Sequence, residues 1–205
     1  MRLPPVLPVL ALSLIALPDV AGAQTFSAGP YVGFSAGGLL LSSTDGSAGS
    51  VDTNVDFAPG FDLAAQLGYR FSFLRAELEV EYGQASVDSF TAGATKVDGN
   101  GDVGILRGTI GGYLDLTIIP IIKPYAGGGV GVANVDGETA VVDGTVVGVE
   151  NSTDLTAHGE IGFTWTLFPI VDLVPAYRFI WIDNGDDRID DTTAHVFKLG
   201  TRFEF

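Results

Sequence analysis

The sequence predicts an all-β protein, an eight-stranded antiparallel up-and-down β-barrel that crosses a membrane. Polar and apolar residues alternate in eight segments of roughly ten residues each, and the links between these segments are alternately short and long. Beyond the N-terminus, no stretch reaches the roughly 18 to 20 consecutive apolar residues that a membrane-spanning helix needs. With 46% hydrophobic and 17% charged residues, the chain of 205 residues has the composition of a folded protein.

The N-terminal residues 1–23 predict a secretory signal peptide. Arg2 provides the positive start, Leu7 to Leu17 form an apolar stretch, and Ala21 to Ala23 match the small-x-small pattern of a cleavage site. We therefore expect export, removal of the signal peptide and a mature chain of residues 24–205 that forms one barrel domain. The sequence contains no cysteine, so disulfide bonds and thiol chemistry are excluded.

Alternation with a period of two is the main signal for strands. In Arg75 to Tyr82 charged side chains occupy the odd positions and apolar ones the even positions, which would place all the charges on one face of a strand. The eight predicted strands are 30–41, 60–71, 74–83, 103–116, 124–134, 155–167, 172–182 and 194–205.

The links between the predicted strands differ in length in a regular order. Short links lie at 72–73, 117–123 and 168–171, whereas the links rich in Gly, Ser, Thr and Asp run over 42–59, 84–102, 135–154 and 183–193. Short turns at one end and long loops at the other are typical of a membrane barrel.

Alternation alone does not say whether the apolar face meets lipid or a core, because a soluble ligand-binding barrel shows the same period. The charges favour lipid outside, since six cations and seven anions on the polar faces nearly balance, as an enclosed lumen requires. The predicted lumen charge network is Asp62, Arg70, Arg75, Glu77, Glu79, Glu81, Arg107, Asp115, Glu160, Arg178, Lys198, Arg202 and Glu204.

Glycines and aromatic residues support the same orientation. An eight-stranded barrel has little interior space, so we expect glycines on the polar face to make room for long Arg and Glu side chains. These glycines are Gly33, Gly37, Gly68, Gly111, Gly127, Gly129, Gly131, Gly162 and Gly200. Aromatic residues on the apolar face, including Tyr69, Phe71 and Phe168 near the short turns and Tyr82 and Trp181 near the long loops, suit the two membrane interfaces.

Several segments together resemble the OmpA-like, or small porin-like, outer-membrane β-barrel family. They are Gly68 to Phe71, Arg75 to Glu79, Pro124 to Gly131 and Leu199 to Phe205, and the resemblance covers the whole mature chain. It implies a place in the bacterial outer membrane and contact with the assembly machinery of outer-membrane barrels. Phe197, Leu199, Phe203 and Phe205 match the C-terminal signal that this machinery reads. Nothing follows Phe205, so we expect no peptidoglycan-binding domain.

The function expected from these features is structural, or one of interaction at the cell surface, with the lumen plugged by paired charges. The alternatives are a small-solute channel, although open channels usually need about 16 strands, and a soluble exported ligand-binding barrel. A net charge of −15 argues against nucleic-acid binding. We expect outer-membrane lipid and lipopolysaccharide as neighbours of the barrel.

The acidic loops raise the hypothesis that divalent cations bridge them to lipopolysaccharide, because hard oxygen ligands suit Ca²⁺ or Mg²⁺. The residues concerned are Asp45, Asp52, Asp56, Asp88, Asp98, Asp102, Asp136, Glu138, Asp143, Glu150, Asp154, Asp183, Asp186, Asp187, Asp190 and Asp191. We expect no dedicated metal site and no cofactor, since the segment beginning at Asp98 departs from the calcium-loop pattern at Val103 and Thr109. We also expect no enzymatic activity, because neither His158 nor His195 has a suitably placed serine in the sequence.

Overall fold

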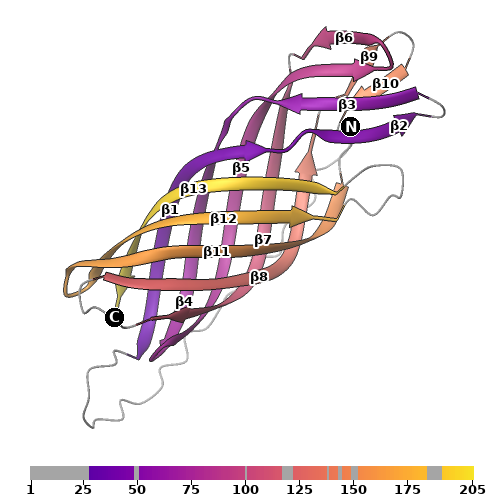
Figure 1. The fold of residues 1–205 in the computed structure, drawn as a ribbon. Helices are drawn as coiled ribbons and strands as arrows, with labels where there is room; N and C mark the ends of the chain where they lie inside the picture. The colour runs from indigo at the N-terminus through magenta and orange to yellow at the C-terminus, as the bar shows by residue number, and fades with distance from the viewer. Residues whose placement is uncertain are drawn as a thin grey trace, which may run out of the picture.

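The protein is a closed β-barrel in the computed structural model (Figure 1), which describes residues 28–48, 51–99, 101–116, 122–137, 139–142, 145–148, 152–183 and 191–205. Each barrel strand is antiparallel to both neighbours, and the pairing of β5 with β7 closes the ring. The barrel strands are β1 (Gly29–Leu41), β4 (Gly60–Phe71), β5 (Leu74–Ala92), β7 (Asp102–Asp115), β8 (Ile122–Asp136), β11 (Ser152–Phe168), β12 (Val171–Ile182) and β13 (Thr192–Glu204).

These strands confirm the predicted eight-stranded antiparallel barrel. The ring order β5-β4-β1-β13-β12-β11-β8-β7 joins sequence neighbours throughout, apart from the contact between β1 and β13 that brings the two ends of the chain together. In the part of the chain that the structure describes, no helix is long and apolar enough to cross a membrane. The predicted signal peptide, residues 1–23, lies outside the described residues.

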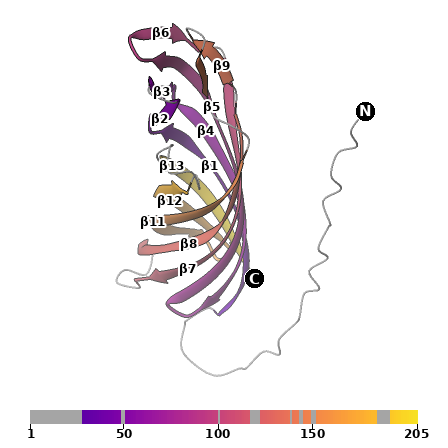
Figure 2. The same cartoon turned by 90° about the vertical axis from the view of Figure 1, so that its right-hand side faces the viewer.

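The predicted long loops differ from the structure, because three of them contain strands. The segment 42–59 holds β2 (Thr44–Ala48) and β3 (Val51–Phe57), and 135–154 holds the separate hairpin of β9 (Thr139–Val142) and β10 (Thr145–Gly148). In 84–102, β5 continues to Ala92 and turns at Gly93, where φ is 56°, into β6 (Thr95–Asp98). β3 and β6 pair with the two edges of this extension, so the sheet continues beyond the barrel wall (Figure 2).

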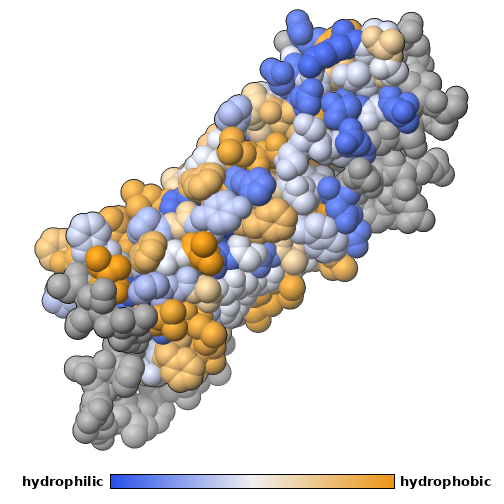
Figure 3. Space-filling model, in the orientation of Figure 1, coloured by the Kyte–Doolittle hydropathy of each residue, from blue (hydrophilic) through white to orange (hydrophobic). Residues whose placement is uncertain are grey.

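The side chains of the barrel strands are apolar outside and polar inside. Leu78, Phe163 and Phe197 are 47%, 51% and 59% exposed, whereas Glu79 and Arg178 are 4% and 0% exposed. Apolar side chains therefore cover the outer wall, and hydrophilic ones gather at the end that carries β2, β3 and β6 (Figure 3). The lipid-facing apolar side chains form a band around the barrel, which we call the apolar belt. On β5 the outward side chains are apolar at Leu78, Val80 and Tyr82 and polar after Tyr82, so the apolar belt ends where the extension of β5 begins.

The interior of the barrel has two layers of different character. Charged and tyrosine side chains fill the part near the short turns and the middle. The part near the long loops is filled by a second set, which we call the apolar layer. Its buried members are Leu39, Val55, Ala85, Val87, Phe90, Ala92, Val103, Ile105, Ala133, Val135, Ile180, Ile182, Ala194 and Val196. Val55, Phe90 and Ala92 come from the sheet outside the ring, so this sheet covers the loop end of the lumen.

Substitution of Leu78 by Lys tests the lipid-facing orientation. The ammonium group would face acyl chains in the middle of the apolar belt, and we expect the free energy of unfolding to fall by about 2 to 4 kcal/mol. Asp88→Lys, on the same face of β5 but beyond the belt, should change it by less than about 1 kcal/mol. Urea unfolding in lipid vesicles measures the free energy of unfolding of both variants. Equal losses in the two variants would contradict a lipid-facing Leu78.

Candidate functional site

The most prominent feature of the barrel is a cluster of charged side chains in its lumen, which we call the charge cluster. All thirteen charged residues predicted for the lumen face inward; twelve are buried and Glu204 is half-buried. The structure adds Asp172, which is 3% exposed and which the sequence analysis missed because it lies at the start of its strand. The charge cluster therefore contains these six cations and eight carboxyl groups.

Arg178 on β12 is the centre of the charge cluster. Its guanidinium group contacts the carboxylates of Glu79 and Glu81 on β5 and Glu160 on β11. Nη2 lies 2.6 Å from Oε2 of Glu160, and Nε donates to the same oxygen over 2.7 Å. Because the side chain is fully buried, its charge depends on these carboxylates for compensation. One arginine thus joins two opposite walls of the barrel.

Lys198 and Arg107 complete this central group. Nζ of Lys198 lies 2.7 Å from Glu160 and 3.6 Å from Glu79, and Nη2 of Arg107 lies 2.6 Å from Glu81. Each of the three central carboxylates therefore contacts two cations, so the charges are paired away from water.

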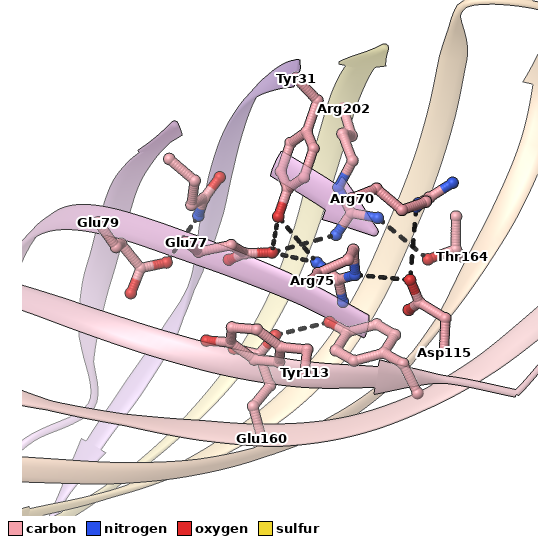
Figure 4. A network of polar contacts seen from close by, with 12 residues as sticks. Tyr31, Arg70, Arg75, Glu77, Glu79, Tyr113, Asp115, Glu160, Thr164 and Arg202 are labelled. Atoms are coloured by element: carbon pink, nitrogen blue, oxygen red, sulfur yellow. Dashed lines mark hydrogen bonds and ion pairs between the residues drawn. The ribbon is translucent and has the colours of Figure 1, made fainter. Parts of the chain in front are cut away.

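A second group of charges lies toward the short turns (Figure 4). Asp115 accepts from Nε of Arg75 over 2.7 Å and lies 3.5 Å from Nε of Arg70. Arg70 also lies 2.6 Å from Glu204, and Arg75 contacts Glu77. These contacts join β4, β5, β7 and β13 at the turn end of the lumen.

Three tyrosines surround the Arg75 guanidinium group, and the sequence analysis did not assign them to the lumen. The guanidinium carbon lies 4.8 Å, 4.9 Å and 5.9 Å from the ring centroids of Tyr125, Tyr113 and Tyr31. Such contacts are favourable for a cation that has lost its water. Tyr125 also donates its hydroxyl proton to Glu160 over 2.6 Å. The tyrosines therefore link the two groups of charges.

Each of these tyrosines lies directly across from a glycine on the neighbouring strand. The cross-strand pairs are Tyr31 with Gly68, Tyr113 with Gly127, and Tyr125 with Gly162. A Cβ atom at any of these glycines would collide with the facing ring. The expectation that lumen glycines make room for larger groups is met here by tyrosines rather than by Arg and Glu side chains. The alternation pattern could have found these pairs, since each tyrosine occupies an inward position of its strand.

The two histidines have tyrosine partners. In the lumen, Nε2 of His158 lies 2.9 Å from the Tyr113 hydroxyl group, and on the outer wall Nδ1 of His195 lies 2.7 Å from the Tyr177 hydroxyl group. Within the described residues, neither ring has a serine as its hydrogen-bond partner. These tyrosine contacts do not form the serine, histidine and acid arrangement of a hydrolase.

At the loop end, Asp56 on β3 joins the strands of the outer sheet. It accepts from Ser43 over 2.8 Å and from Ser89 over 3.0 Å, and Nζ of Lys96 lies 3.4 Å away. The two hydroxyl donors and the lysine hold the pKa of the Asp56 carboxyl group below its ordinary value.

The described residues contain no group of three or more His, Asp or Glu side chains that could hold a metal ion. Six of the acidic loop residues, namely Glu138, Asp143, Glu150, Asp186, Asp187 and Asp190, lie outside the described residues. Divalent-cation bridging therefore stays a prediction. The residues of the predicted C-terminal signal, Phe197, Leu199, Phe203 and Phe205, all point outward, and their reading by the assembly machinery also stays a prediction.

Comparison with known proteins identifies the class to which this barrel belongs. A family model for the outer membrane protein beta-barrel domain matches residues 7–205, so the chain belongs to that family. It is accordingly a β-barrel protein of the bacterial outer membrane.

Solved structures share the fold. Neisserial surface protein A is 19% identical with a TM-score of 0.59, and the match covers 86% of this chain and 97% of that one. The outer membrane protein AlkL, determined in lipid bilayers, is 13% identical with a TM-score of 0.51, covering 93% and 97% of the two chains. No curated protein matches the sequence.

Replacement of Arg178 by Gln tests whether the charge cluster stabilises the barrel. It leaves three buried carboxylates short of a cation, so we expect the free energy of unfolding to fall by about 3 to 5 kcal/mol. Lys96→Gln removes a pair whose lysine is 59% exposed and should cost about 0 to 1 kcal/mol. Urea unfolding in lipid vesicles compares them, and an Arg178→Gln barrel as stable as the wild type would show that the cluster does not contribute.

Proposed function

We propose that this protein is a closed, non-conducting barrel that anchors and displays a β-sheet at the outer surface of the bacterium. The observation that carries this proposal is the double filling of the lumen, by the charge cluster and by the apolar layer. The charge cluster alone would not show that the lumen is closed, because charged side chains can also line a polar path. The apolar layer follows it along the barrel axis, so a solute would have to pass both.

The cavity inside the charge cluster next to Tyr31 is small. The cavity between Tyr31, Glu77, Tyr125, Glu160 and Lys198 has a volume of about 20 Å³. A single water molecule needs roughly 10 to 15 Å³ by the same kind of measure. Passage of a solute would require several ion pairs to separate in a place without water, and this is costly. The cavity therefore favours a plug over a channel.

The apolar layer supports closure at the loop end. Leu39, Ile105 and Val196, on three different strands, are all 5% exposed or less, and Phe90 packs against this layer from the sheet outside the ring. An ion beyond the charge cluster would be surrounded by the side chains of the apolar layer, which offer it no polar partner. A small-solute channel, the alternative function, finds no support in this arrangement.

The sheet of β2, β3, β5 and β6 is the surface that we propose to be displayed. It lies beyond the apolar belt, and its polar face carries Asn54, Asp56, Thr91 and Lys96. Hydrogen bonds between Asn54 and Asp45, and from Ser43 to Asp56, hold β2 and its preceding residue to β3. These contacts hold the segment in a sheet, as suits a contact with lipopolysaccharide or another ligand outside the cell.

Conductance in planar lipid bilayers tests the closed lumen. We expect the wild-type barrel to give no steady openings, because the charge cluster and the apolar layer both block the axis. A large porin inserted into the same bilayers serves as the control for insertion and detection. Steady openings of one defined size from the wild-type protein would overturn the proposal in favour of a small-solute channel.

Cysteine labelling on intact cells tests which end of the barrel faces the outside. The protein has no native cysteine, so each variant carries a single thiol. Ala94→Cys places a thiol in the turn between β5 and β6, and Pro169→Cys places one in the turn between β11 and β12. A membrane-impermeant maleimide should label only the first in intact cells and both after lysis. Labelling of the second alone in intact cells would reverse the proposed orientation.

A further inference from the structure

Two carboxyl groups of the charge cluster form no ion pair among the described residues, and one of them also has no cation opposite it on a neighbouring strand. Glu77, Glu79, Glu81, Asp115, Glu160 and Glu204 each lie within 4.0 Å of a lysine or arginine nitrogen. Among the described residues, Asp62 and Asp172 have no such contact. Asp172 has Arg202 directly opposite on β13, whereas Asp62 has Gly37 and Gly83 opposite on its two neighbouring strands.

The carboxyl group of Asp62 is buried and has no protein donor among the described residues. Its side chain is 1% exposed, and within the described residues neither carboxyl oxygen accepts a hydrogen bond from an N–H or O–H group. Beside Asp62, the inner face at Gly83 is covered by Leu39 of the apolar layer. An ionised carboxylate at this place would be buried without compensation, and this is strongly unfavourable.

Glu81 on β5 is the carboxyl group diagonally across from Asp62: it lies two residues from Gly83, which is directly opposite Asp62, and both carboxyl side chains are buried on the inner face of the wall. Oxygens of two ionised carboxylates only accept hydrogen bonds, so contact between them requires one proton. Glu81 itself lies 2.6 Å from Arg107 and also contacts Arg178, so cations hold its ionised form. We propose that Asp62 and Glu81 form a carboxyl pair that binds one proton in the folded barrel, with Asp62 as the donor.

The other charged groups around the pair do not replace this proton. Lys198 is engaged by Glu160 and Glu79, Arg178 by Glu79, Glu81 and Glu160, and Arg107 by Glu81. Glu79 adds a further negative charge on the same strand as Glu81. On strand β1, Gly37 lies directly opposite Asp62, and Lys198 on β13 is next in the same register row. A proton on Asp62 lets it donate a hydrogen bond to Glu81, so both carboxyl groups gain a partner without a further group between them.

The proposal makes folding of this barrel a proton-uptake reaction at neutral pH. In the unfolded chain an aspartate is ionised above roughly pH 4 to 5, so folding must return one proton to Asp62. Asp62→Asn removes this requirement, because the amide N–H can donate to Glu81 at any pH. Between about pH 5 and 7, the folding constant of the wild type relative to that of Asp62→Asn should therefore fall about tenfold per pH unit.

Urea unfolding of the full barrel in lipid vesicles at several pH values measures this ratio. Asp115→Asn is the matched control, since it removes a carboxylate that contacts Arg70 and Arg75. It should weaken folding while leaving the pH dependence parallel to that of the wild type. A pH-independent ratio between the wild type and Asp62→Asn would show that Asp62 is ionised and would overturn the proposal.

Infrared spectroscopy of the wild-type protein tests the pair without relying on the folding of any variant. At pH 7 we expect an absorption band of a protonated carboxyl group that shifts when aspartate carries ¹³C in its carboxyl group. The band should persist in Asp115→Asn and be missing from Asp62→Asn if that variant folds. A wild-type spectrum at pH 7 without a protonated aspartate band would refute the shared proton.

Discussion

Every backbone N–H and C=O group that faces acyl chains must find its partner within the protein, and this requirement determines the rest of the structure. The eight strands meet it by closing into a ring through the pairing of β5 with β7. A ring of eight strands leaves a lumen only as wide as its own side chains. The lumen must therefore be packed, and because the outward positions are apolar, the polar positions of the same strands are forced to pack against one another.

The charge cluster follows from this requirement. Arginine and lysine reach across the lumen from β12 and β13 to glutamates on β5 and β11, so that pairing of charges also ties distant walls together. The tyrosines fill the remaining space and give Arg75 aromatic contacts in place of water. Toward the loop end, the interior that the structure describes changes to the apolar layer.

The strand positions and the inward charges could be predicted because alternation is strict wherever one face meets lipid. Arg75 to Tyr82 is one such stretch, and every residue of it lies as expected. Beyond the belt this constraint ends, and β2, β3, β6, β9 and β10 were assigned to loops because the links that contain them are rich in Gly, Ser, Thr and Asp. Val51 to Phe57 does alternate, but weakly. The apolar layer was missed for a related reason: its alanines and valines resemble lipid-facing residues unless their register is followed along each strand.

The pairing of each lumen tyrosine with a glycine across the strand has an evolutionary consequence. Tyr31 needs the empty space at Gly68, and a side chain at position 68 would be incompatible with the ring. The two positions can therefore change only together, with a smaller residue at 31 accompanying any larger one at 68. The same holds for Tyr113 with Gly127 and for Tyr125 with Gly162, so among relatives of this barrel these six positions should vary as three linked couples.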